Sequence, residues 1–192
     1  MPRASLSPAA VVDAARDLID AEGATALSMS AVARRVNVQP ASLYVHIRDL
    51  AALRAALQTS ILAEVADQTA DAVAGRSRLD ALRGFAQAQR DYAFAHPARW
   101  AMLQEPVEDA AAASPAASRV SSLLLAVLRG YRLPESEGVH AARFVGGAVA
   151  GYLALEGARS FAHRDDSTET SWARAVDAID RALTSWPQEA HS

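Results

Sequence analysis

The chain has 192 residues, a formal net charge of −3 and no cysteine, which excludes disulfides, thiolate nucleophiles and cysteine-based metal sites. This length allows one or two domains with a sizeable core. No apolar segment follows Met1 to Arg3 as a secretory signal would require, and the longest uncharged apolar run, Phe144 to Leu155, is shorter than the roughly 20 residues that cross a bilayer. We therefore expect a soluble, cytoplasmic protein with no membrane partner.

The charge is unevenly distributed along the chain. Residues 1–50 contain five arginines and five acidic residues and sum to zero, so residues 51–192 carry the whole −3. Four of these five acids lie between Asp13 and Glu22, whereas four of the five arginines lie outside that segment. Phosphate contacts are local, because charges are screened beyond about 8–10 Å. The negative total therefore does not exclude a nucleic-acid partner.

The first predicted helix lies between Ser7 and Gly23. Ser7 suits the N-cap, Pro8 suits the first helical position, and Gly23 is a typical C-terminal stop. Apolar residues recur at helical spacing and predict one buried face, made of Val11, Ala14, Ala15, Leu18 and Ile19. This helix would brace the two that follow.

Two short helices joined by a tight turn are predicted between Leu27 and Leu53. Ser28 suits the N-cap of the first, and its apolar stripe consists of Met29, Val32, Ala33 and Val36. Asn37 can end this helix and redirect the chain, because asparagine tolerates a left-handed backbone. Pro40 suits the first turn of the second helix. The pair reads as a helix-turn-helix.

The second helix of this pair has an unusual outer face. Val38, Leu43 and Ile47 can face inward, which leaves the following residues pointing out: Gln39, Pro40, Ala41, Ser42, Tyr44 and His46. A solvated face is usually rich in Glu, Lys and Arg, whereas this face has no carboxylate. Hydroxyl groups can donate to phosphate oxygens, Gln39 can read a base edge, and Ala41 can pack on a thymine methyl group. The face therefore suits a polyanion.

The segment from Gln39 to Ile47 resembles the recognition helix of the TetR family of bacterial transcriptional regulators. The Leu-Tyr-x-His core of that helix falls on Leu43, Tyr44 and His46, and the resemblance extends over roughly Leu6 to Leu57. It implies that Tyr44 and His46 hold the DNA backbone.

One residue departs from the family pattern. The family usually has lysine shortly after this helix, where this chain has Leu50, so we expect Arg48 to supply that phosphate contact. Arg3 lies in a short arm before the first helix, and such arms can enter a minor groove. The expected DNA-contacting residues are Arg3, Arg34, Arg35, Gln39, Pro40, Ala41, Ser42, Tyr44, His46 and Arg48.

Apolar periodicity predicts further helices along the rest of the chain. Their expected ranges are 49–74, 77–95, 97–104, 115–131 and about 135–161, followed by a last helix that carries Trp172 and Trp186. The Ala-rich, acidic stretch from Pro106 to Ser114 is expected to be a loop. The chain shows no strand alternation, so the fold class is all-α.

Two of these helices indicate a homodimer. Gly146, Gly147 and Gly151 lie within one predicted helix, where each costs up to about 1 kcal/mol relative to alanine, and close approach of another helix would explain them. The last helix has a nearly continuous apolar stripe. A homodimer through both helices is also what the resemblance implies, with Gly147, Gly151, Trp172, Val176, Ile179 and Leu183 at the interface. The alternative is that both helices complete the core of one chain.

Aromatic residues near helix breaks and in helix middles can line an apolar cavity between helices. The expected lining of an effector site is Tyr92, His96, Trp100, Leu103, Leu124, Phe144 and Tyr152. Phe94, Met102, His140 and Glu156 are additional candidates. For each of these residues an ordinary core or surface position is the alternative.

Signals for catalysis or metal binding are weak. Glu137 and His140 form a lone Glu-x-x-His, whereas a helical di-iron site needs two such motifs and two further glutamates. No nucleophile elbow, phosphate-binding loop or dinucleotide fingerprint occurs. We therefore expect no enzymatic activity, no metal and no cofactor.

These observations predict a helix-turn-helix DNA-binding domain in residues 1–50, followed by a helical effector-binding and dimerisation domain in residues 51–192. The expected function is a dimeric repressor that a small, largely apolar effector releases from a double-stranded DNA operator. Two alternatives remain open: a DNA-binding regulator without an effector, and a helical enzyme or scaffold.

Overall fold

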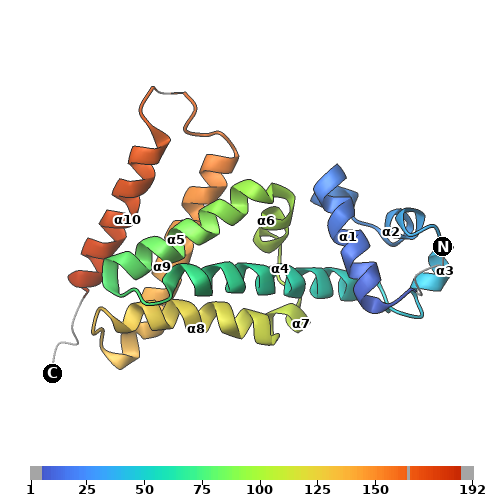
Figure 1. The fold of residues 1–192 in the computed structure, drawn as a ribbon, viewed down its shortest axis with the longest axis horizontal. Coiled ribbons are helices and arrows are strands. Elements are labelled where there is room, and N and C mark those ends of the chain that lie inside the picture. Colours follow the sequence, from blue (N-terminus) through green and yellow to red (C-terminus); the bar gives the residue numbers. More distant parts are fainter. Residues whose placement is uncertain (1–5, 164, 187–192) are drawn as a thin grey trace. The chain divides into compact units, whose positions relative to one another are not determined.

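The computed structural model describes residues 6–163 and 165–186, and these ranges contain helices and connecting turns but no strand (Figure 1). The α-helices are α1 (Pro8–Glu22), α2 (Met29–Arg35), α3 (Pro40–Leu43), α4 (Leu50–Val73), α5 (Arg78–Ala95), α6 (Pro97–Gln104), α7 (Asp109–Ala112), α8 (Pro115–Arg129), α9 (Gly138–Gly157) and α10 (Thr168–Thr184). Two 3₁₀ turns, η1 (Ala24–Ala26) and η2 (Glu135–Glu137), precede α2 and α9. Within the described ranges no helix is both long and apolar enough to span a bilayer.

The chain forms two compact units that share α4. Unit 1 runs to Glu64 and includes His96–Ser118, and unit 2 consists of Val65–Ala95 and the residues from Arg119 onward. The functional boundary expected at residue 50 lies inside unit 1, because α6 and α7 belong with α1 and the first part of α4.

The predicted helix ends of unit 1 are confirmed by their hydrogen bonds. The Ser7 hydroxyl accepts from the Ala10 N–H and the Ser28 hydroxyl accepts from the Ala31 N–H, each at 3.2 Å. Gly23 has a φ of 86°, which suits the residue that ends α1. The buried side chains of this unit include Val11, Ala15, Leu18, Ile19, Leu27, Met29, Val32, Ala33, Leu43, Ile47, Leu53, Leu57 and Ile61.

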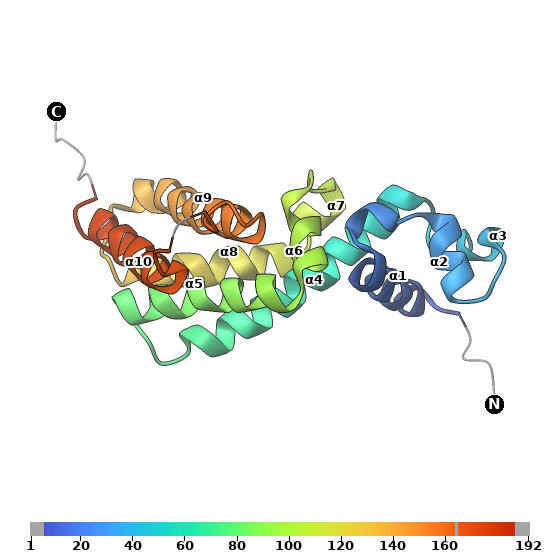
Figure 2. The same ribbon diagram turned by 90° about the horizontal axis from the view of Figure 1, so that it is seen from above.

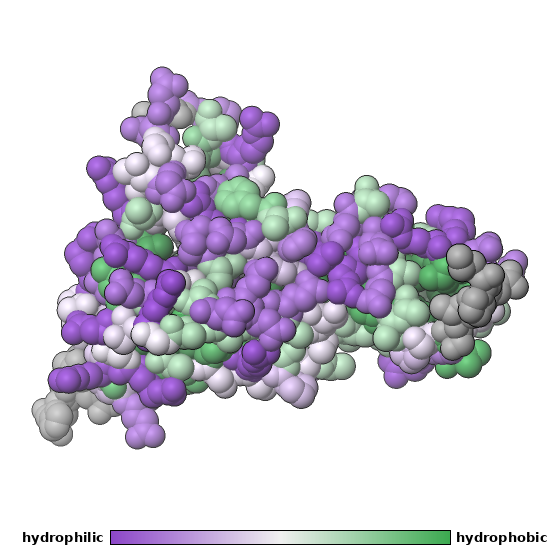
Figure 3. All heavy atoms as spheres, viewed as in Figure 1, coloured by the Kyte–Doolittle hydropathy of each residue, from purple (hydrophilic) through white to green (hydrophobic). Residues whose placement is uncertain are grey.

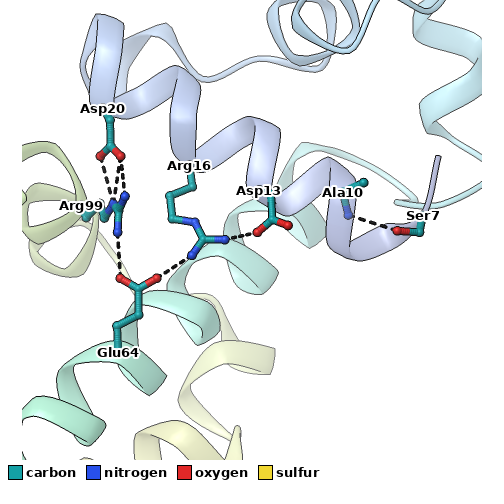
Figure 4. Close-up of polar contacts among 7 residues, drawn as sticks. All are labelled: Ser7, Ala10, Asp13, Arg16, Asp20, Glu64 and Arg99. Atoms are coloured by element: carbon teal, nitrogen blue, oxygen red, sulfur yellow. Dashed lines mark hydrogen bonds and ion pairs between the residues drawn. The ribbon is translucent and has the colours of Figure 1, made fainter. Parts of the chain in front are cut away.

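A chain of ion pairs ties three helices of unit 1 together (Figure 4). The Arg99 guanidinium of α6 donates to Asp20 of α1 at 2.6 Å and to Glu64 of α4 at 2.9 Å. Arg16 of α1 donates to the other oxygen of Glu64 at 2.6 Å and also pairs with Asp13. The side chains of Arg99, Asp20 and Glu64 are only 16%, 31% and 28% exposed, so solvent screens these pairs less than a surface pair.

A buried amide holds the α6–α7 segment against α4. Gln58 is 1% exposed, and its side-chain nitrogen donates to the carbonyl oxygens of Met102 and Pro106 at 3.1 and 3.3 Å. Its side-chain oxygen accepts from the N–H of Glu108 at 3.2 Å. Arg54, one helical turn earlier, pairs with Glu105. The three bonds of Gln58 thus satisfy backbone groups in the last turn of α6 and just after it.

Unit 2 packs α5, α9 and α10 against one another (Figure 2). Arg90 of α5 lies at their junction with an 8% exposed side chain, and it donates to Glu156 of α9 at 2.8 Å and to Glu169 of α10 at 2.6 Å. Its guanidinium carbon also lies 5.2 Å from the centroid of Trp172. The hydrogen bonds to Glu156 raise the pKa of Arg90, so this group stays charged within the core.

The apolar stripe of α10 faces the inside of its own unit. Trp172, Val176, Ile179 and Leu183 are only 4%, 3%, 7% and 1% exposed. The four side chains that we expect at a dimer interface thus bury apolar area within one chain, and their place in an interface stays a prediction. Gly147 and Gly151 of α9 are exposed.

Several predicted elements differ from the observed ones, and the last helix, for example, ends at Thr184, before Trp186. The segment expected to be a loop contains one helical turn, α7, because alanine is a strong helix former. Ala111 in this turn is fully buried. The helix expected to reach Phe161 ends at Gly157. Arg159, two residues later, has a left-handed φ of 58°. Backbone N–H groups of Arg159 and Ser160 bond to the carbonyls of Glu156 and Leu155, which closes the end of α9.

Substitution of Arg99 tests the ion-pair chain. Arg99→Gln leaves two partly buried carboxylates without this guanidinium, and we expect the free energy of unfolding to fall by about 1–3 kcal/mol. The measurement is urea denaturation followed by circular dichroism. Arg119→Gln is the matched control, because it breaks an ion pair with Asp67 whose side chains are 49% and 67% exposed, and such surface pairs contribute about 0–1 kcal/mol. Equal losses in the two variants would contradict a structural role for Arg99.

Candidate nucleic-acid interface

The turn of the helix-turn-helix is built on Asn37. This residue has a φ of 55°, as predicted for the residue that ends α2. The N–H of Asn37 donates to the Arg34 carbonyl at 3.1 Å, and the N–H of Val38 donates to the Ala33 carbonyl at 3.0 Å. This pair of bonds is the Schellman motif, which normally has glycine at the left-handed position. It satisfies the carbonyls at the end of α2 and sends the chain into α3 within a few residues.

The recognition helix is shorter than the expected segment 39–47. Helix α3 covers only Pro40–Leu43, and the chain then makes one tighter turn in which the N–H groups of His46 and Ile47 both donate to the Leu43 carbonyl, at 2.8 and 2.9 Å. Leu43 is fully buried and Ile47 is 8% exposed. These two anchors, four residues apart, fix which way the intervening side chains point.

The predicted outer face is largely open to solvent. Gln39, Ala41, Ser42 and Tyr44 are exposed, whereas Pro40 and His46 are half-buried. Arg34 and Arg35, in the last turn of α2, are also exposed. Arg3 lies outside the described residues. The segment from Asn37 to Arg48 therefore presents amides, hydroxyls, an aromatic ring and an imidazole, and it has no carboxylate.

Arg48 lies at the end of this face, directly before the cap of α4. It is 83% exposed, and its Nε donates to Asp49 at 2.7 Å. Asp49 in turn caps α4, because its other oxygen accepts from the Ala52 N–H at 2.8 Å. The backbone bond from Ala52 and then the bond from Arg48 lower the pKa of Asp49. An exposed pair of this kind is weak, so Arg48 can turn toward a phosphate at little cost.

Val45 is a residue to which the sequence analysis assigned no role. It is 83% exposed and lies between Tyr44 and His46. The spacing of Val45 in the sequence could have indicated its position. It follows Ala41 by four residues and therefore shares the outer face of the recognition segment.

The residues expected to line an effector site divide between the two units. His96, Trp100 and Leu103 belong to unit 1, and Tyr92, Leu124, Phe144 and Tyr152 belong to unit 2. Trp100 is 8% exposed and its buried indole N–H has no hydrogen-bond acceptor within the described residues. In unit 2, Tyr92 and Leu124 are buried, whereas Phe144 is 40% exposed and packs on Trp186.

Tyr152 lines a pocket of about 340 Å³ in unit 2. The other residues around this pocket are Ser160, Phe161, His163, Asp166, Thr168 and Ser171. The ring of Tyr152 lies 5.1 Å from that of Phe161 and 5.0 Å from that of Trp172, measured between centroids. Burial raises the pKa of the Tyr152 phenol, so the hydroxyl remains a hydrogen-bond donor at neutral pH. None of the other expected lining residues borders this pocket.

The single metal-like motif does not form a cluster. Glu137 accepts a hydrogen bond from the Trp186 indole N–H at 2.9 Å. Among the residues that the structure describes, no group of three or more His, Asp or Glu side chains is placed to hold a metal ion.

Comparison with known proteins assigns both parts of the chain to one family. Residues 11–57 match the family model "Bacterial regulatory proteins, tetR family", and residues 82–179 match "Tetracyclin repressor-like, C-terminal domain". The uncharacterized HTH-type transcriptional regulator YobS of Bacillus subtilis is 30% identical over 169 residues, which cover 88% of each chain.

Two solved structures share the fold. BioQ bound to its natural double-stranded DNA operator matches with a TM-score of 0.74 and 21% identity, covering 94% of this chain and 99% of that chain. A TetR variant from Acinetobacter baumannii in complex with minocycline matches with a TM-score of 0.74 and 19% identity, covering 97% and 100%. Because the matches extend through both the helix-turn-helix and the helical remainder, the chain belongs to the TetR family of bacterial transcriptional regulators and is a DNA-binding regulator, not an enzyme.

Proposed function

We propose that the protein is a dimeric, cytoplasmic repressor that binds a double-stranded DNA operator through α3 and is released by a small, largely apolar effector. The observation that carries the proposal is the outer face of α3, which offers hydrogen-bond donors and apolar groups without a carboxylate and follows a fully bonded helix-turn-helix turn. Two of the four acids of α1, Asp13 and Asp20, are paired with arginines of the same unit, which reduces their repulsion of DNA.

The side chains of this face suit different parts of a duplex. Tyr44 and His46 would donate to phosphate oxygens, and Ser42 would assist them. Gln39 would read a base edge, and Ala41 would pack on a thymine methyl group. Pro40 starts α3 and would contact the DNA only through its ring. The proposed phosphate contacts from cationic side chains are Arg34, Arg35 and Arg48, with Arg3 reaching a minor groove.

A homodimer would place two copies of α3 in successive major grooves, about 34–36 Å apart. The outward face of α9 supports this part of the proposal. Its large apolar side chains Phe144 and Leu155 are 40% and 50% exposed, which is uncommon for a helix whose packing is complete within one chain. Gly147 and Gly151 lie on the same exposed side, and a methyl group on either would meet no atom within 4 Å. A partner helix could therefore approach closely there.

The effector part of the proposal rests on the pocket of unit 2 and on the sharing of α4. Pockets that bind small molecules usually enclose about 300–1,000 Å³, and the space beside Tyr152 falls in that range at about 340 Å³. The solved TetR variant that shares this fold is bound to minocycline. We propose that an effector selects a conformer in which α4, which is continuous through both units, holds the two recognition helices at a spacing that no longer fits the operator.

Operator binding tests the DNA role. Wild type, the Tyr44→Ala/His46→Ala double variant and the control Arg119→Gln are titrated with duplexes selected from a random pool, across a salt series. We expect saturable, sequence-preferring binding that weakens with salt in wild type and in the control. The double variant should bind at least about tenfold more weakly, because each lost hydrogen bond to a charged phosphate contributes about 1.5–3 kcal/mol. Equal binding by wild type and the double variant would refute the proposed interface.

Substitution on the outer face of α9 tests the dimer. Gly151→Arg adds a long charged side chain where the chain itself leaves open space, so the subunit should still fold but should self-associate at least about tenfold more weakly. Gly157→Arg is the control, because it lies six residues further on and on a different side of the helix. Sedimentation equilibrium measures the dissociation constants, and an unchanged constant for Gly151→Arg would place the interface elsewhere.

A ligand screen tests the effector. Compounds that raise the melting temperature of wild type are titrated against the protein–operator complex, and a true effector should lower operator affinity by about 5–150-fold. Tyr152→Ala should bind the compound less tightly while keeping its operator affinity in the compound's absence. Compounds that bind tightly and leave operator affinity unchanged would contradict the switching model.

A further inference from the structure

Among the described residues, the most exposed large apolar side chain is at the recognition segment. Val45 is 83% exposed, compared with 56% for Phe94 and 54% for Val139, which come next. Figure 3 shows hydrophobic residues among hydrophilic ones on the part of the surface that belongs to α2 and α3. Single exposed apolar residues are common on proteins, so exposure alone indicates nothing. The position of Val45 on the recognition segment is what gives its exposure a meaning.

Val45 lies opposite the buried side of its segment. Leu43 and Ile47, which anchor the segment to the core, are two residues before and two residues after it, and two residues correspond to roughly half a helical turn. The backbone bonds from His46 and Ile47 to the Leu43 carbonyl keep this stretch helical enough for the spacing to hold. Val45 therefore occupies the centre of the outer face.

The neighbours of Val45 differ from it in chemistry. Tyr44 on one side, 53% exposed, and His46 on the other, half-buried, can both form hydrogen bonds. Ala41, one turn earlier on the same side, is also apolar and exposed. The outer face thus has an apolar centre line flanked by polar groups, an arrangement in which the flanks suit phosphates and the centre suits the floor of a groove.

A valine side chain has no donor or acceptor, so it cannot bind a phosphate or a polar base edge. In the major groove the apolar group that distinguishes one base pair from another is the C5-methyl group of thymine. We propose that Val45 is a specificity-determining residue that reads a thymine in each operator half-site through this methyl group. The inference rests on the proposed DNA-binding function.

Replacement of thymine by deoxyuridine removes only this methyl group and leaves base pairing intact. In duplexes selected by wild type, each thymine is replaced in turn and the dissociation constant is measured at constant salt. At the thymine that Val45 reads we expect a loss of about fourfold in one half-site, the value for burial of one methyl-sized group, and about fifteenfold when both half-sites are changed. A thymine that packs on Ala41 also responds, but it responds equally in wild type and in the Val45 variants.

Two variants identify the side chain that reads the methyl group. Val45→Ala removes both γ-methyl groups and shortens the side chain, and Val45→Ser also removes both methyl groups but adds a hydroxyl. Because Val45 is almost fully exposed, both should fold as wild type does, which circular dichroism melting will check. Each should bind the thymine duplex more weakly and respond less than twofold to the uracil replacement at the thymine that Val45 reads. Val107→Ala, at another exposed valine of the same unit, should respond as wild type does.

The outcomes separate this inference from the DNA-binding function itself. If no uracil replacement weakens wild type, or if Val45→Ala retains the full response, Val45 does not read thymine. Salt-dependent binding that Tyr44→Ala/His46→Ala abolishes would then still support the DNA role. If no duplex is selected at all, both the role and the inference are refuted.

Discussion

The geometry of unit 1 depends most on the ion pairs that Arg99 forms. A single guanidinium bonds to α1 through Asp20 and to α4 through Glu64, and so ties together helices that are far apart in the sequence. Arg16 extends the same chain along α1, and Gln58 holds the other end of α6 to α4. The helix-turn-helix is thus not an independent module. It packs against α1, and α1 is bonded to α6 and α4.

The same bonds settle an electrostatic problem. A cluster of four acids on α1 would repel a polyanion, but the pairing of Asp13 and Asp20 with arginines cancels part of that charge where it arises. The outer face of α3, which has no carboxylate, lies within the same unit. Net charge is therefore a poor guide to this protein, because phosphate contacts respond to charges within about a Debye length. The net charge of −3 comes from residues 51–192, which are not among the expected DNA contacts.

Unit 2 uses a buried charge in a comparable way. Arg90 joins α5 to α9 and α10, and its pairing with the 8% exposed Glu156 compensates both groups for the loss of water. With α10 packed by its whole apolar stripe, the large apolar side chains of unit 2 that remain exposed lie on α5, α8 and α9. The strongly amphipathic α10 therefore covers its apolar stripe within its own unit.

Local signals in the sequence determined much of the secondary structure, because they act within a few residues. The caps Ser7 and Ser28, the left-handed Asn37 and the helix Pro97–Gln104 all follow from short-range hydrogen bonds and backbone sterics, and all are as predicted. The family resemblance of the recognition segment was readable for the same reason. Only the tertiary structure decided which surface covers each apolar stripe, since periodicity identifies an apolar face but not its partner. The burial of Trp172 within its own chain and the pairing of Arg99 with residues 35 and 79 positions away depend on contacts between distant segments, which no local pattern encodes.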